Sequence, residues 1–422
     1  MRSLAAIALC ACTGCASLAA GERANDRVNP EVPTWFKRPS GDMHVFVHRD
    51  LALGGKKSSD EYEHGKPEID PAHDRVFVGT SDHGLYALRA TDGSTIWRFE
   101  TAGMVQSEPL YDAITDVVYF GSHDGALYAV AARDGKLLWR FNSGAEIQKK
   151  PTMFGEILIF ANAADMLFAV DRRTGKTRWS SHRTPALGME IQGYAAPLVD
   201  GRTVYIAYSD GHVAAFDALD GSERWSVDLA AESERLGESQ RYFDVDTTPV
   251  LADVPQGRVV FVASYAGGLF ELDAENGTRL ANDDKVLGVT ALTMYRDAEH
   301  TPHPLGPDKG GPRVPARQIL LASSASTGLW AIDPATRRTL WRDPVPEGGI
   351  TAAVQVAGAV AVGTTRYGLF LINVLDGRSI DVVDLGTGFS MTPAAYGNRL
   401  YTMSNGGTLL GIGVDPPLPM RK

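Results

Sequence analysis

The sequence predicts an all-β fold, an eight-bladed β-propeller of four-stranded antiparallel blades that is closed by an N-terminal strand. Three observations predict it. A pair of apolar strands joined by a glycine-containing turn recurs eight times, an Asx-Gly turn often follows the second strand, and a tryptophan often follows that turn. Such self-similarity is typical of stacked copies of one supersecondary unit. A length of 422 residues would ordinarily suggest several domains, but the repeat favours one.

The first copy defines the pattern. Val76-Phe77-Val78-Gly79 is followed by Leu85-Tyr86-Ala87-Leu88, then by Asp92-Gly93 and Trp97. Most copies are 40 to 46 residues apart, and the two longer intervals, 56 and 60 residues, leave room for loop insertions. The second strands begin at Leu85, Leu127, Leu167, Val213, Leu269, Leu329, Leu369 and Leu409.

The apolar blocks indicate strands rather than helices, because they alternate or run in fours and are rich in Val, Ile, Tyr and Phe. Pairs such as Asp92-Gly93 supply the positive φ that two-residue hairpin turns need. Six copies have a proline at the start of the innermost strand, where its missing N–H breaks no ladder. These prolines are Pro67, Pro109, Pro151, Pro197, Pro249 and Pro393.

The recurring tryptophans are interpreted as structural, since a large aromatic side chain after the turn can wedge between neighbouring blades. The fifth and seventh copies carry Ala281 and Asp381 at this position. The strand His44–His48 precedes the first copy, while the eighth copy ends near Val414 without a fourth strand, so we expect this N-terminal strand to complete the last blade. The predicted blade-docking residues are Trp97, Trp139, Trp179, Trp225 and Trp341.

The N-terminus is typical of a targeting segment. Arg2 precedes a short apolar run, and Thr13-Gly14 stands directly before Cys15, which resembles the lipobox of bacterial lipoproteins. We therefore expect a signal peptide over 1–15 with lipidation at Cys15, a flexible tether over 16–42, and the propeller over 43–422. Cys12 is the alternative acylation site, and an ordinary signal peptide is the alternative interpretation. No aspartate follows Cys15, which by analogy with lipoprotein sorting indicates the outer membrane.

The composition excludes several classes of function. A net charge of −10 without a long basic run argues against nucleic acid as a partner. All three cysteines lie within the first 15 residues, so a chain acylated at Cys15 has no disulfide, thiol nucleophile or cysteine metal site in its folded part. The histidine pairs His44/His48 and His300/His303 lack a well-spaced third ligand. We expect no catalytic residue, metal or cofactor.

Two families share features with these repeats. The run from Ala169 to Trp179, A-V-D-R-R-T-G-K-T-R-W, resembles the repeat of quinoprotein alcohol dehydrogenases, which hold pyrroloquinoline quinone in an eight-bladed propeller. The segment Phe243–Val250, F-D-V-D-T-T-P-V, resembles the BamB family of outer-membrane assembly lipoproteins more specifically, as does Met189–Pro197, M-E-I-Q-G-Y-A-A-P. These two segments carry the family-specific signal, whereas the repeat architecture carries the rest.

The BamB resemblance implies a site and a partner. In that family the two segments form the surface that docks onto the BamA barrel protein, so the resemblance places Met189 and Ile191 where two leucines stand and Gln192 where an arginine stands. That last change replaces a bidentate charged donor with a neutral amide. With Asp244 and Asp246, these residues are the candidate partner-binding site. The implied protein is a non-enzymatic scaffold, monomeric within its complex and lipid-anchored at the periplasmic face of the outer membrane.

Three alternatives remain at this stage. Met189 and Ile191 are core residues, and Asp244 and Asp246 cap a turn, if the resemblance is one of architecture alone. A generic cell-surface propeller that binds another protein or a polysaccharide shares the fold and the anchor. A quinone-dependent dehydrogenase is disfavoured, because members of that family commonly stack the quinone on a vicinal disulfide and no convincing cluster of calcium ligands stands out.

Overall fold

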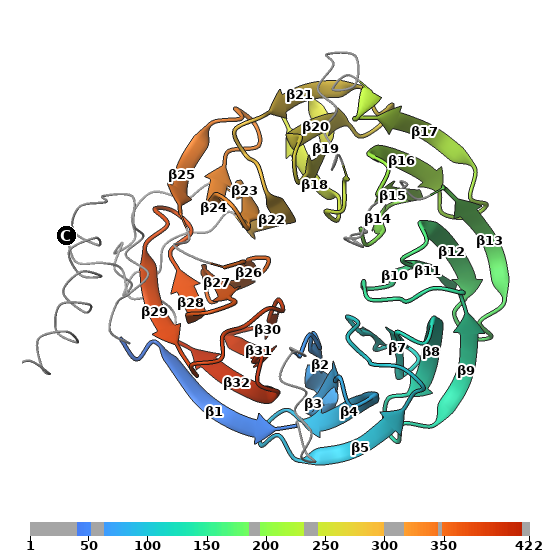
Figure 1. Cartoon of the computed structure of the whole chain (residues 1–422), viewed down its shortest axis with the longest axis vertical. Helices are drawn as coiled ribbons and strands as arrows, with labels where there is room; N and C mark the ends of the chain where they lie inside the picture. Colours follow the sequence, from blue (N-terminus) through green and yellow to red (C-terminus); the bar gives the residue numbers. More distant parts are fainter. Residues whose placement is uncertain are drawn as a thin grey trace, which may run out of the picture.

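The predicted fold is confirmed by the computed structural model, which describes residues 40–51, 63–184, 195–231, 244–298, 316–344 and 348–415. Eight four-stranded antiparallel sheets stand around a central axis (Figure 1). Within these ranges, no helix has the length and apolar character required to cross a membrane.

The first four blades follow the chain order from the axis outward. Blade 1 contains β2 (Glu68–Asp70), β3 (Arg75–Gly79), β4 (Gly84–Arg89) and β5 (Thr95–Glu100), with the 3-10 helix η1 (Pro71–His73) between β2 and β3. Blade 2 contains β6 (Leu110–Asp112), β7 (Val117–Gly121), β8 (Ala126–Ala131) and β9 (Leu137–Asn142). Blade 3 contains β10 (Thr152–Phe154), β11 (Ile157–Ala161), β12 (Met166–Asp171) and β13 (Thr177–His182). Blade 4 contains β14 (Leu198–Asp200), β15 (Thr203–Ala207), β16 (His212–Asp217) and β17 (Glu223–Asp228).

The remaining blades keep this order, except that the last one takes its outer strand from the N-terminus. Blade 5 contains β18 (Val250–Val254), β19 (Gly257–Ser264), β20 (Gly268–Asp273) and β21 (Arg279–Asp283). Blade 6 contains β22 (Val289–Asp297), β23 (Arg317–Ser324), β24 (Gly328–Ile332) and β25 (Thr339–Asp343). Blade 7 contains β26 (Val354–Val356), β27 (Ala359–Thr364), β28 (Gly368–Ile372) and β29 (Ser379–Val383). Blade 8 contains β30 (Ala394–Tyr396), β31 (Arg399–Met403), β32 (Thr408–Val414) and β1 (Met43–Asp50).

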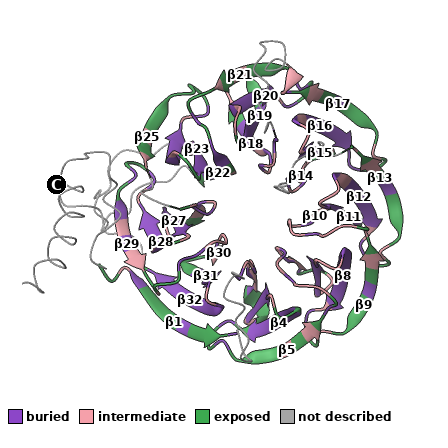
Figure 2. Cartoon of the chain, viewed as in Figure 1, coloured by how far each residue is buried: buried purple, intermediate pink, exposed green. Residues whose placement is uncertain are grey.

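Burial explains why the blades stack. The second and third strands of each blade are almost wholly buried, because both of their faces pack against neighbouring blades, whereas the outermost strands are exposed at alternating positions (Figure 2). In β9, for example, Trp139 is buried while Leu138 and Arg140 face solvent. A sheet that is hydrophobic on both faces needs a neighbour on each side, and a closed ring supplies both.

Five tryptophans of the outer strands cross to the next blade. The indole N–H of each donates to a backbone carbonyl in the next blade, at 2.8 to 3.2 Å, as in the bond from Trp179 to Ala218. The ring also lies against the turn glycine of that blade, so that a Cβ at Gly221 would stand 2.6 Å from Trp179. These glycines therefore give both the positive φ and the space for the indole. The five residues are Trp97, Trp139, Trp179, Trp225 and Trp341.

Three blades lack this tryptophan; blades 5 and 7 use charged groups instead, and Val47 of blade 8 lies against Gly93. Blade 5 has Ala281 opposite Glu271, and Arg337 of blade 6 binds the Glu271 carboxylate with its guanidinium, Nη2 to Oε1 at 3.2 Å. Arg337 occupies the turn position that is glycine elsewhere and keeps a positive φ of 62°. An ion pair therefore replaces the contact between indole and glycine at this blade boundary.

Blade 7 uses Asp381 to hold the closing strand. Its Oδ2 accepts the backbone N–H of Met43 at 2.7 Å, and its Oδ1 accepts that of Ser40 at 2.8 Å. The strand β1 then pairs with β32 from Met43↔Val414 to Asp50↔Thr408, with a bulge between Val45 and Val47. The ring is thus closed by a ladder and by one buried carboxylate that anchors the start of the strand.

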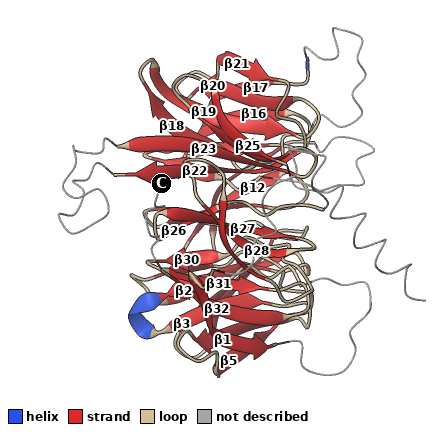
Figure 3. Cartoon of the chain, turned by 90° about the vertical axis from the view of Figure 1, so that its left-hand side faces the viewer, coloured by secondary structure: helices blue, strands red, loops and turns tan. Residues whose placement is uncertain are grey.

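The chain path gives the propeller two different faces. Because successive strands are antiparallel, the segments that lead from the outer strand of one blade to the inner strand of the next all lie on one face, here called the connector face. The hairpins within blades that contain η1 and the Asx-Gly turns lie on the opposite face, here called the turn face (Figure 3). Ser40 and Asp415 lie at the turn face, since the Asp415 N–H donates to Asp42 and that of Val414 to Asn398 in such a hairpin.

Candidate protein-docking site

The segment Asp244–Pro249 lies on the connector face between β17 and β18 and is pinned by two buried side chains. Val245 is buried, and its N–H donates to the carbonyl of Tyr208 at 3.3 Å. The Thr247 hydroxyl accepts the N–H of Ala263 at 2.8 Å and donates to the Ala263 carbonyl at 3.1 Å. Val245 and Thr247 flank Asp246 and fix the backbone on both of its sides. The positions of Asp244 and Asp246 are therefore set by these two buried neighbours.

One oxygen of each carboxylate lacks a hydrogen-bond donor within the part of the chain that the structure describes. The Oδ1 atoms of Asp244 and Asp246 are both buried and accept no hydrogen bond from a described group. Burial raises the pKa of Asp244, and burial together with the Asp244 charge raises the pKa of Asp246 to about 6, against the opposing charge of Lys149. Buried acceptors without donors destabilise a fold, and natural proteins retain few of them. Each of the two carboxylates therefore keeps an oxygen to which no described group donates.

The other predicted contact residues, Met189, Ile191 and Gln192, lie outside the described residues, as does Cys15. The described end of their connector is Ala195–Pro197. The Ala196 N–H donates to the Thr248 hydroxyl at 3.1 Å, so this end lies directly beside the segment that carries Asp244 and Asp246. The two segments that the sequence analysis selected therefore meet at the inner edges of blades 4 and 5.

Next to this segment is an axial channel that the sequence analysis missed. It has a volume of about 890 Å³ and is lined by residues from all eight blades. In blades 1 to 3 the lining is charged: Lys66 Nζ lies 2.5 Å from Glu108 Oε1, and Lys150 Nζ lies 2.6 Å from Glu68 Oε2. Burial acts to raise the pKa of Glu108, but the neighbouring lysines outweigh it and the pKa lies below its ordinary value.

A signal for this channel was present in the sequence. Lys66, Glu108 and Lys150 each stand directly before one of the prolines that open an inner strand, and Thr248 and Thr392 occupy the same position in other blades. The residue before such a proline faces the axis in these blades. Comparison of the residue before the inner-strand proline in each repeat would have located the charged half of the channel.

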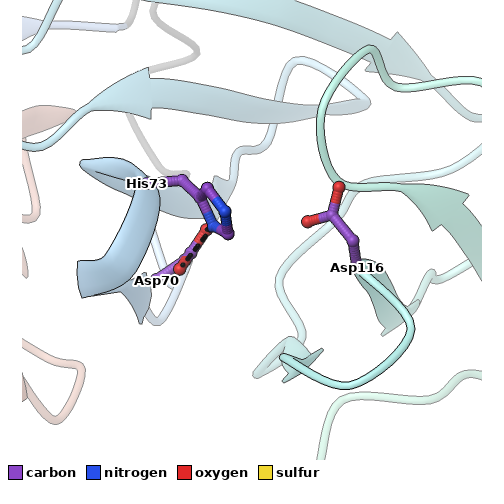
Figure 4. Close-up of side chains that lie close together, drawn as sticks. All are labelled: Asp70, His73 and Asp116. Carbon is purple, nitrogen blue, oxygen red and sulfur yellow. Dashed lines mark hydrogen bonds and ion pairs between the residues drawn. The ribbon is translucent and has the colours of Figure 1, made fainter.

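The described residues contain one cluster with metal-ligand geometry, Asp70, His73 and Asp116, on the turn face between blades 1 and 2 (Figure 4). His73 Nδ1 lies 3.0 Å from Asp70 Oδ2. The buried Arg75 already supplies the cation, because its Nη2 lies 2.6 Å from Asp70 Oδ2 and also pairs with Asp116 of the next blade. This cluster is therefore an ion-pair network that joins two blades, and we assign it no metal.

The ring of tryptophan-docked blades defines a repeat propeller that carries an acidic connector segment at its inner edge. Comparison with known proteins assigns the family. The family model described as outer membrane protein assembly factor BamB matches residues 113–343, more than half of the chain, and the chain belongs to this family. Among curated relatives, BamB of Yersinia pestis is 24% identical over 348 residues, which cover 79% of this chain and 68% of that protein.

Other matches extend the comparison. BamB of Legionella pneumophila (strain Paris) is 21% identical over 237 residues, so the match covers 56% of this chain and about half, 54%, of that relative. Among solved structures, BamB from Moraxella catarrhalis gives a TM-score of 0.67 at 20% identity, covering 88% of this chain and 99% of the other. A quinohemoprotein alcohol dehydrogenase from Pseudomonas putida HK5 gives 0.64 at 14% identity, covering 91% and 78%. At these identities the solved structures demonstrate the fold alone.

Proposed function

We propose that this protein is a non-enzymatic scaffold of the outer-membrane β-barrel assembly machinery. It docks through its connector face on the periplasmic domains of a BamA-type protein and so assists the insertion of β-barrel proteins. No covalent step is needed, because the contribution of such a scaffold is organisation and local concentration. Membership of the BamB family supports the assembly role.

The single observation that carries the docking surface is the pair of unsatisfied carboxylates at Asp244 and Asp246. A charged acceptor that is buried without a donor gains most from a partner that supplies one, because the desolvation cost has already been met within the folded chain. An arginine, a lysine or backbone N–H groups of the partner fit this requirement. Met189, Ile191 and Gln192 are proposed to complete the contact with two apolar side chains and an amide.

The N-terminal anchor is proposed to act from the other face. Ser40, the first described residue, lies at the turn face, so a tether from a lipidated Cys15 joins the propeller opposite the docking surface. A chain of this length reaches at most about 80 Å when fully extended, at roughly 3.3 Å per residue. This arrangement leaves the connector face free for a partner while the protein stays at the periplasmic face of the outer membrane.

A binding titration tests the proposal. The purified full-length chain and the periplasmic domains of the BamA-type protein of the same organism are combined, and the affinity is compared among variants. The double variant Asp244→Asn/Asp246→Asn removes both charges while it preserves size, and we expect at least a tenfold loss, about 1.4 kcal/mol or more. Ile191→Asp is expected to weaken docking as well, because it places an unpaired charge in an apolar contact.

The matched control is Asp134→Asn, the same chemical change at an exposed turn on the opposite face, where the carboxylate binds the local N–H of Lys136 and the exposed side chain of Arg133. It should bind like the wild type. If the double variant folds and binds as tightly as this control, the carboxylates are not part of the interface and the assigned surface is wrong. If the wild type does not bind the BamA-type protein at all, the partner is wrong and the generic-scaffold alternative takes its place.

A further inference from the structure

The axial channel is divided into two chemically different halves. Its lysine and glutamate residues, Lys66, Glu108, Lys149 and Lys150, all come from blades 1 to 3, which also contribute Leu110 and Met153. Blades 6 to 8 contribute no charged residue to the lining and include Leu292, Ile350 and Met391. A cavity of about 890 Å³ is in the range that holds a small organic ligand, roughly 300–1,000 Å³. The lining suits a ligand with a charged group at one end and an apolar body at the other.

The charged half has one cation in excess of its close ion pairs. Lys66 is paired with Glu108, and Lys150 with Glu68. Lys149, between them in the chain, lines the same channel and makes no hydrogen bond or ion pair with any described residue. Asp246 and Glu108 act on its charge only through space, and burial lowers the pKa of Lys149 in spite of them. An ammonium group has three N–H bonds to donate, and a desolvated one is stabilised by an acceptor.

We propose that the axial channel is a binding site for a small amphipathic organic anion, with a carboxylate or phosphate group on Lys149 and its apolar body against Leu292, Ile350 and Met391. A cationic ligand is disfavoured, because Lys149, the lysine of the polar wall without a close ion pair to a described residue, would repel it. A purely inorganic anion would leave the apolar wall in contact with water, so burial of apolar surface would add nothing to its binding free energy. The proposal rests on the channel and not on the docking proposal, although Asp246 acts on Lys149 through space.

Calorimetric titration of the full-length chain with 1-naphthyl phosphate tests this site. This probe joins a phosphate to an apolar ring system, and inorganic phosphate serves as the head group alone. We expect saturable binding at one site per chain, weakened at least tenfold in Lys149→Gln and retained within about threefold in Lys149→Arg, which keeps the charge. Inorganic phosphate should bind at least tenfold more weakly than the probe. All titrations use the same detergent, so partition into micelles cancels between variants.

The matched control is Lys176→Gln, the same substitution at an exposed turn of the same blade on the turn face. It should bind the probe like the wild type, and the thermal unfolding of each variant shows that it is folded. Binding of the probe to Lys149→Gln as tight as to the wild type overturns the assignment. 1-Naphthoate, which carries a carboxylate on the same ring system, is titrated in parallel. The absence of saturable binding of both 1-naphthyl phosphate and 1-naphthoate to the wild type also overturns the assignment. Equal affinities for the probe and inorganic phosphate would reveal an adventitious ion only and would also refute it.

Discussion

Substitution of Asp381 by alanine should open the ring at its closing strand. Asp381 is 1% exposed and accepts the N–H groups of Ser40 and Met43, at 2.8 and 2.7 Å, across more than 330 residues of chain. A hydrogen bond to a charged group contributes about 1.5–3 kcal/mol, so the loss of both predicts a decrease of roughly 3–6 kcal/mol in the free energy of unfolding. Asp381→Asn keeps one acceptor oxygen and should lose about half as much.

Denaturant unfolding and amide hydrogen exchange measure this effect. The exchange of Met43–Asp50 should accelerate more than that of β31 or β32, because the ladder that remains loses its anchored end. Asp384→Ala is the matched control, since its carboxylate accepts only the nearby Gly386 N–H at 2.7 Å. If Asp381→Ala costs less than about 1 kcal/mol and β1 stays as protected as in the wild type, the ladder alone closes the ring and the reasoning fails.

Three further predictions concern blade docking and the acidic segment. Arg337→Ala should cost about 3 kcal/mol, because it leaves the buried Glu271 without its partner, and adding Glu271→Gln should restore part of the loss in denaturant unfolding. Trp179→Ala should cost about 3–5 kcal/mol in the same assay, through the cavity and the lost bond to Ala218, and a loss below 1 kcal/mol would contradict a docking role. The pKa of Asp246 is raised from 3.8 to about 6 in the folded protein, so the carboxyl destabilises the fold above pH 6 and this penalty fades as the pH falls toward 4. Asp246→Asn should therefore be more stable than the wild type at about pH 7.5, by at most about 3 kcal/mol, with no difference near about pH 4, and an equal or lower stability at neutral pH would refute the assigned burial.

The architecture could be predicted from the sequence because the signals that specify each blade lie close together in the chain. The turn glycines, the prolines before inner strands and the apolar blocks each act within a few residues of themselves, so their spacing predicts eight copies and their boundaries. The missing fourth strand of the last copy predicts closure by His44–His48, which pairs with β32 as expected. These features needed no knowledge of contacts between distant residues.

The exceptions depended on distant partners. Nothing near Asp381 in the chain indicates that it binds Ser40 and Met43, and nothing near Ala281 indicates that Arg337 fills the place of a tryptophan and a glycine. The tryptophan pattern shows that positions 281 and 381 depart from the repeat. Their interaction partners, however, follow only from the geometry of the ring. A missing consensus residue in a repeat protein is therefore a place to look for a charged substitute.

The candidate site was predictable only in part, for the same reason. Asp244 and Asp246 were selected by resemblance, whereas their unsatisfied oxygens and the nearby charge of Lys149 arise from blades brought together by the fold. Lys149 lies 97 residues from Asp246 in the sequence and acts on it across the inner edge of the ring. Sequence spacing alone contains no information on such a pair.

The central claim, docking through the connector face, is tested most directly by site-specific photocrosslinking in cells. A photoreactive residue is placed at Tyr265, an exposed residue on the connector face of blade 5, and separately at Leu219, an exposed residue on the turn face of blade 4. We predict an adduct with the BamA-type protein from position 265 and none from position 219, with the former lost in Asp244→Asn/Asp246→Asn. An adduct from position 219 alone, or from neither while the two proteins still copurify, would contradict docking through this face.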